Sequence, residues 1–68
     1  MNNAINIINE TLRVMSNHAF DLVGHDDYVS NEIYYWYMLL DEKIELGEAT
    51  LESALSCLEQ ATLEMNKL

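Results

Sequence analysis

Hydrophobic residues in the first third of the chain recur at the spacing of one face of an α-helix. They form a stripe at intervals of three and four residues: Ile5, Ile8, Leu12, Met15, Ala19 and Leu22. Because an α-helix turns once in about 3.6 residues, these intervals place the side chains on one face. Asn2 or Asn3 can cap the start, and Gly24 stands where a left-handed residue commonly ends a helix. The pattern predicts an amphipathic helix over about residues 3–23.

The second segment is apolar on more than one side. Its main stripe comprises Val29, Ile33, Trp36, Tyr37, Leu40 and Ile44, and further apolar side chains surround the middle: Tyr34, Tyr35, Met38 and Leu39. A helix of this kind must be covered on several sides. We therefore predict a central helix over about residues 28–46, flanked by other helices or by a second subunit. Asp26, Asp27 and Ser30 are alternative caps for its start.

A third stripe follows Gly47 and predicts a helix over about residues 50–67. It consists of Leu51, Leu55, Leu58, Thr62 and Met65, and it is widened by Ala54, Ala61 and Leu68. Thr50 is a suitable cap, because its hydroxyl can accept a hydrogen bond from a free amide of the first turn. We expect the leucines of this stripe to face the core.

These patterns predict a single all-α domain over residues 1–68, folded as a small antiparallel three-helix bundle. The alternative is a helical hairpin whose third helix packs only in a dimer. The chain has no proline and two glycines, which suits helices joined by short turns. A core of this size rarely contributes more than about 3–5 kcal/mol. Since Cys57 is the only cysteine, further stabilisation must come from a partner or a second copy.

The charge balance is strongly acidic. Twelve Asp and Glu against three Lys and Arg give a formal net charge of −9. We therefore expect no direct binding of nucleic acid and none of anionic membranes, because both repel a negative protein. Four acids at intervals of four, three and four residues span the Gly47 turn: Asp41, Glu45, Glu48 and Glu52. Such a surface favours solubility, and it also complements a basic surface of another protein.

Four consecutive aromatic residues mark the middle of the second helix. At about 100° per residue, positions 34–37 point to all sides of a helix. We place Trp36 and Tyr37 in the core with Ile33, which leaves Tyr34 and Tyr35 partly exposed. Exposed tyrosines are frequent anchors of protein interfaces. The predicted partner-binding residues are therefore Tyr34, Tyr35, Asp41, Glu45, Glu48 and Glu52.

Candidate residues for chemistry are few and scattered. His18, His25 and Cys57 do not converge in any spacing typical of a metal or a catalytic site, so we expect no enzyme activity, metal or cofactor, and a buried Cys57. The longest apolar run, residues 33–40, would cover about 12 Å of a bilayer core of about 30 Å. The start of the chain lacks the basic and apolar pattern of a secretory signal. We therefore expect a cytoplasmic protein.

Together these features predict an acidic helical module that binds another protein. We expect it to act stoichiometrically, as an inhibitor or regulator of a larger protein with a basic surface, such as a nucleic-acid-binding protein. In size and charge it is similar to the small acidic inhibitors of phages and mobile elements, including anti-CRISPR and anti-restriction proteins. One alternative is a chaperone or adaptor subunit that completes its core with a partner helix. Another is a self-associating structural protein, a homodimer with the second helix at the two-fold interface.

Overall fold

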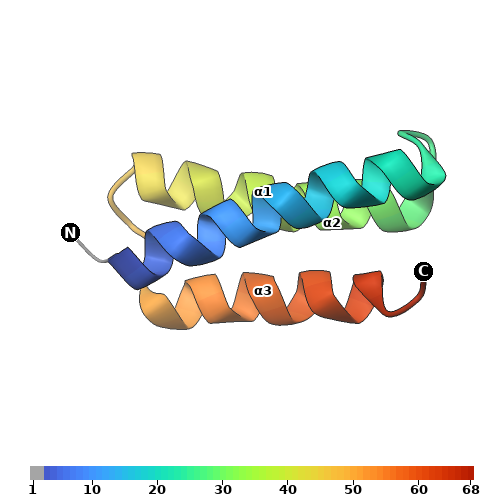
Figure 1. The fold of residues 1–68 in the computed structure, drawn as a ribbon. Helices are drawn as coiled ribbons and strands as arrows, with labels where there is room; N and C mark the ends of the chain where they lie inside the picture. The colour runs from blue at the N-terminus through green and yellow to red at the C-terminus, as the bar shows by residue number, and fades with distance from the viewer. Residues whose placement is uncertain (1–2) are drawn as a thin grey trace.

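A computed structural model describes residues 3–68, which form three helices (Figure 1). The helices are α1 (Asn3–Val23), α2 (Tyr28–Glu45) and α3 (Leu51–Met65). Consecutive helices run antiparallel, and all three pack against one another. The Cα atoms extend over 34 × 18 × 14 Å. The predicted all-α three-helix bundle is confirmed, and no second subunit is needed to place the third helix.

The turn between α1 and α2 is closed by a glycine, an aspartate and a serine. Gly24 adopts a φ of +83°, and its N–H donates to the Phe20 carbonyl at 2.8 Å. Asp27 is the N-cap of α2, since its Oδ1 accepts from the Val29 N–H at 2.8 Å. The Ser30 hydroxyl donates to the Gly24 carbonyl at 2.6 Å. Of the three predicted caps, Asp27 is therefore the one that is used.

The turn between α2 and α3 uses the glycine and the threonine that the sequence indicated. Gly47 has a φ of +73°, and the Glu48 N–H donates to the Lys43 carbonyl at 2.8 Å, which closes the end of α2. Thr50 and Ser53 form a reciprocal capping box, in which each backbone N–H donates to the other side chain at 3.0 Å. At the start of α1, Asn3 is the first helical residue, and Asn2 lies outside the described residues.

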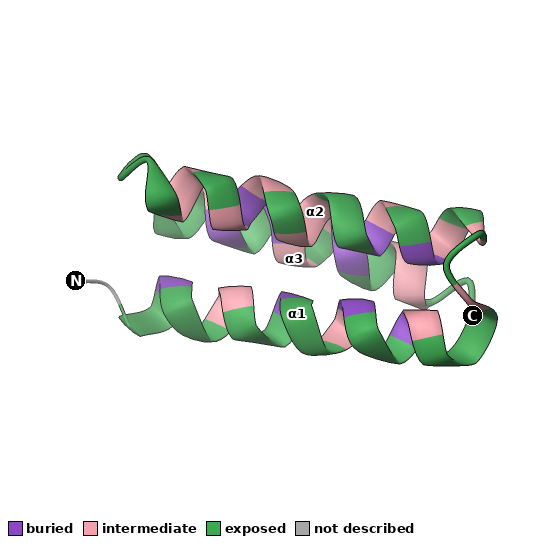
Figure 2. Ribbon diagram, turned by 90° about the horizontal axis from the view of Figure 1, so that it is seen from above, coloured by how far each residue is buried: buried purple, intermediate pink, exposed green. Residues whose placement is uncertain are grey.

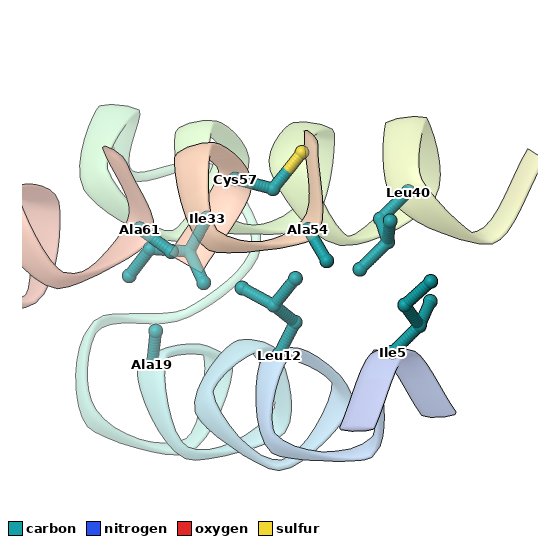
Figure 3. Close-up of a cluster of buried hydrophobic side chains, with 8 residues drawn as sticks. All are labelled: Ile5, Leu12, Ala19, Ile33, Leu40, Ala54, Cys57 and Ala61. Carbon is teal, nitrogen blue, oxygen red and sulfur yellow. The ribbon is translucent and has the colours of Figure 1, made fainter. Parts of the chain in front are cut away.

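The core is a narrow column between the three helices (Figure 3). Its buried members are Ile5, Leu12 and Ala19 from α1, Ile33 and Leu40 from α2, and Ala54, Cys57 and Ala61 from α3. The three α1 side chains point toward those of α2 and α3. The fully buried residues of α3 are all small, so the largest buried side chains of the column are Leu12, Ile33 and Leu40 from the other two helices.

The predicted core stripe of α3 is wrong at three of its five positions. Leu51 and Leu55 are 42% and 50% exposed, and Thr62 is exposed as well, whereas Leu58 and Met65 are half-buried and pack against the core. The fully buried positions are Ala54 and Ala61, which were expected only to widen the stripe, and Cys57, which was expected to be buried. The helix is therefore rotated so that its small residues face the core and Leu51 and Leu55 lie at the edge.

The last residue of the predicted α1 stripe is also exposed. Leu22 lies in the C-terminal turn of α1, and α1 is 21 residues long against 15 for α3. Figure 1 shows this turn extending past the end of α3. Figure 2 shows the buried positions of α1 along the edge that faces the two neighbouring helices. Leu22 is exposed because α3 ends before it could cover this turn.

Two serines are buried in the interior. Ser16 of α1 and Ser30 of α2 are both nearly inaccessible. The Ser30 hydroxyl is hydrogen-bonded to the turn before α2. Within residues 3–68, the Ser16 hydroxyl has no hydrogen-bond partner. An unpaired buried hydroxyl opposes folding, whereas a paired one supports it.

We expect opposite effects from two matched substitutions. Ser16→Ala should raise the free energy of unfolding by about 1 kcal/mol, because it removes an unpaired buried hydroxyl and favours the helix. Ser30→Ala should lower it by about 1 kcal/mol, because the turn loses its hydrogen bonds. Urea denaturation followed by circular dichroism measures both changes. A Ser16→Ala variant less stable than the parent protein would contradict this account.

Candidate protein-binding surface

The outer face of the C-terminal half of α2 carries a depression bordered by carboxylates. Six residues line it, and we call them the α2 patch: Tyr35, Met38, Leu39, Asp41, Glu42 and Glu45. The helical repeat places Tyr35, Met38 and Glu42 on the side of α2 opposite Ile33 and the core. The patch therefore combines an aromatic ring and apolar side chains with three acids.

The aromatic ring of the patch is held in place by its neighbour in the chain. The Tyr35 and Trp36 rings meet edge to face, with centroids 5.0 Å apart and planes at 77°. Trp36 is half-buried and packs against the core, while Tyr35 is exposed. An edge-to-face pair is a favoured arrangement of aromatic rings. The surface tyrosine is thus supported by a side chain that is anchored in the fold.

One acid of the patch is fixed by a contact between helices. The Asn9 side chain of α1 donates from Nδ2 to Oδ1 of Asp41 at 3.1 Å. Asp41 is half-buried, whereas Glu42 and Glu45 are exposed. The Asp41 carboxylate therefore has a defined position at the border of α1 and α2, and the two glutamates extend into solvent beside it.

Basic side chains do not neutralise the patch. Within residues 3–68, the ion pairs are Arg13 with Glu10 and Lys67 with Glu64, the latter at 2.9 Å. In each pair the hydrogen bond to the glutamate raises the pKa of the basic group. Neither pair includes an acid of the α2 patch. The three carboxylates of the patch thus form no ion pair within the described residues.

The structure brings together part of the predicted binding set. Tyr35, Asp41 and Glu45 line one depression. Tyr34 is exposed but turns toward α1, where its ring centroid lies 5.7 Å from that of Phe20. Glu48, in the turn, and Glu52, in the first turn of α3, are exposed but do not line the patch.

Sequence reasoning missed three members of the patch: Met38, Leu39 and Glu42. A signal for two of them is present, because Tyr35, Met38, Glu42 and Glu45 follow one another at intervals of three, four and three residues. That spacing marks a single helical stripe. The acids were instead grouped across the Gly47 turn, where the chain changes direction and the helical repeat no longer applies.

A second aromatic cluster joins α1 to α2. The rings of Phe20 and His25 are stacked with centroids 4.2 Å apart, and Tyr34 lies between Phe20 and Tyr37. Burial raises the pKa of the Tyr37 hydroxyl, and the nearby Asp41 carboxylate adds to the shift. These contacts cover the turn between the helices and hold Tyr34 against it.

The remaining candidates for chemistry lie apart from the patch. Cys57 is buried, as predicted, and burial raises the pKa of its thiol. In the described part of the chain, no three His, Cys, Asp or Glu side chains are grouped so that they could hold a metal ion. Across the same residues, every helix is too short or too polar to pass through a bilayer.

The chain was compared with family models, curated proteins and solved structures. No family model matches it, and neither a curated protein nor a solved structure does.

We expect Cys57 to react slowly with thiol reagents in the folded protein. Opening the core of so small a domain costs about 3 kcal/mol, so labelling by Ellman's reagent should be about 100-fold slower than in urea. Because burial raises the thiol pKa, the unfolded chain releases this proton first as the pH rises. The contribution of the protonated Cys57 thiol to the free energy of unfolding is therefore present at neutral pH and is lost as the pH rises through the raised pKa. Equal labelling rates in buffer and in urea would show that Cys57 is accessible.

Proposed function

We propose that the protein docks through the α2 patch onto a basic surface of a larger protein and regulates it stoichiometrically. One observation carries the proposal: three carboxylates, Asp41, Glu42 and Glu45, border a depression that contains the exposed ring of Tyr35. Tyrosine is one of the residues enriched at the energetic centres of protein interfaces, and acids around it provide electrostatic complementarity to a basic surface. In this proposal the protein acts by binding and not by turnover.

The chemistry of the patch defines the partner. Carboxylates that form no ion pair within the protein attract Lys and Arg, and they accelerate the encounter of oppositely charged surfaces. The face of a tyrosine ring also accepts an Arg guanidinium. Asp41 and Glu45 are separated by about 6 Å along the helix axis, so one short helix presents several negative groups on a rigid support. Glu48, Glu52 and Tyr34, which the sequence also suggested, are exposed but lie outside this surface.

Grooves that bind nucleic acid are the basic surfaces that suit such a patch best. They present Lys and Arg to a row of phosphates, and a helix bearing carboxylates can occupy the same positions. The proposed activity is therefore inhibition of a nucleic-acid-binding protein in the cytoplasm, of the kind used in counter-defence by phages and mobile elements.

The role of charge is tested by capture with three tagged baits. The baits are the parent protein, D41N/E42Q/E45Q, and the control D26N/E32Q/E64Q, which removes the same charge from positions outside the patch. We expect parent and control to capture the same basic protein at about 50 mM salt, and capture by the patch variant to fall by about tenfold or more. Salt at about 500 mM should weaken all three. Equal capture by the patch variant would refute the assignment of the site.

The role of the ring is tested on the captured partner after purification. Tyr35→Ala should weaken binding about 30-fold, because truncation of an interface anchor costs about 2 kcal/mol. Tyr28→Ala is the matched control, since Tyr28 is an exposed tyrosine at the other end of α2. Calorimetry gives both affinities and the stoichiometry, which we expect to be one chain per site. Equal losses from the two variants would remove Tyr35 from the interface.

A further inference from the structure

A second exposed surface lies on the side of the bundle turned away from α2. We call it the α1–α3 strip, and its large side chains are Ile7, Val14 and Leu22 from α1 and Leu51, Leu55 and Leu58 from α3. Five of them are between 42% and 66% exposed, and Leu58 is half-buried. Ile7 and Val14 also line an open depression on α1. The strip is distinct from the α2 patch.

Contacts with α2 fix the orientation of both helices. On α1, Asn9 and Phe20 face α2, since they contact Asp41 and Tyr34. At about 100° per residue, Ile7 and Val14 lie on another side of α1. On α3, Glu64 marks the side toward α2, because it pairs with Lys67 at 2.9 Å and Lys67 lies 5.9 Å from the centroid of the Tyr28 ring.

The leucines in the first half of α3 lie on the side away from Glu64. At about 100° per residue, Leu51 and Leu55 are displaced from the buried Ala54 in the direction opposite to Glu64. Because α1 and α3 pack directly on each other, their sides away from α2 form one continuous face.

The strip has the spacing of a surface that receives further helices. On α1, positions 7, 11, 14 and 18 follow at intervals of four, three and four residues, and on α3 positions 51, 55, 58 and 62 do the same. This spacing forms a seam along which another helix can pack. Each helix therefore carries one row of residues that face the core and a second seam that no element within residues 3–68 covers.

Charge identifies what covers the strip. The two seams contain no Asp, Glu, Lys or Arg, although the chain carries a net charge of −9. Acids border the strip instead: Glu10 and Asp21 on α1, and Glu52 and Glu59 on α3. A basic partner would find no carboxylate at the centre of this face. A second copy would find an identical apolar strip, with the acids of both copies kept at the margin.

The size of the face suits a weak dimer. Helix α1 has 21 residues and α3 has 15, so at about 1.5 Å per residue and about 10 Å across, the two offer roughly 500 Å². A standard interface buries about 800 Å² per partner, and weak, transient interfaces bury less. A chain of 68 residues also hides only roughly 60% of the surface of its unfolded form, so association supplies apolar burial that the monomer lacks.

We propose that two copies form a dimer in which α1 and α3 of one pack on α1 and α3 of the other. The interface is isologous, because the same strip serves both copies. The two α2 patches then face outward on opposite sides of the dimer. This interface differs from the one expected from the sequence, which placed the second helix at the two-fold axis.

The oligomeric state and its salt dependence test the proposal. We expect sedimentation velocity at about 200 μM to show a species of twice the 7.9 kDa chain mass that dissociates on dilution. The acidic margins of the two copies repel each other, so about 500 mM salt should strengthen the dimer relative to about 50 mM. Binding to a basic partner responds to salt in the opposite direction, so failure of one proposal leaves the other distinguishable. A monomer at both salt concentrations would overturn the dimer.

Two variants of α3 locate the interface. Leu55→Glu places a charge within the strip and should weaken the dimer about 100-fold. Leu63→Glu is the matched control, because Leu63 is 52% exposed against 50% for Leu55 but lies outside the strip. Circular dichroism verifies that both variants remain helical, and Ile7→Glu repeats the test from α1 if Leu55→Glu does not fold. Equal weakening by Leu55→Glu and Leu63→Glu would place the interface elsewhere.

Discussion

The rotation of α3 about its own axis determines the rest of the structure. Ala54, Cys57 and Ala61 face inward and are buried, so the larger core side chains come from the leucines and isoleucines of α1 and α2. The same rotation turns the leucines in the first half of α3 outward. Leu51 and Leu55 thereby join Ile7 and Val14 on one exposed face. The compact core and the apolar strip therefore have a single cause in the choice of small residues for α3.

The distribution of charge separates the two surfaces of the molecule. The α2 patch gathers Asp41, Glu42 and Glu45 around an exposed ring, and the strip keeps carboxylates at its margin. Electrostatic attraction governs an interface at the patch, and apolar burial governs an interface at the strip. Because the two surfaces lie on opposite sides of the bundle, one can be occupied without obstructing the other. A net charge of −9 thus opposes self-association at the patch while permitting it at the strip.

Local signals in the sequence predicted the helices and their ends, because each signal acts within a few residues. Gly24, Gly47 and Thr50 all adopt the conformations that their chemistry favours. The rotation of α3 could not be predicted in this way. Leu51, Leu55 and Leu58 have helical spacing, and so do Ala54, Cys57 and Ala61. Only packing against α1 and α2 decides which of the two sets faces the core. The burial of Ser16 and Ser30 was not predicted for a related reason, since a polar residue is buried only where another helix covers it. Tyr35, Asp41 and Glu45, which were predicted to bind a partner, line one depression, whereas Glu42 was missed because the acids were grouped across a turn.

The proposed dimer links stability to binding. A small core leaves a marginal free energy of unfolding, and a partner that binds only the folded chain increases it according to concentration. A second copy provides that stabilisation without a longer chain, because the strip is already present on every molecule. Pairing also doubles the number of α2 patches on one particle. Two linked patches bind a partner with repeated basic sites more tightly than either alone, because the second contact forms at a high effective concentration. The exposed leucines of α3 would then serve recognition indirectly, by joining two acidic surfaces into one bivalent molecule.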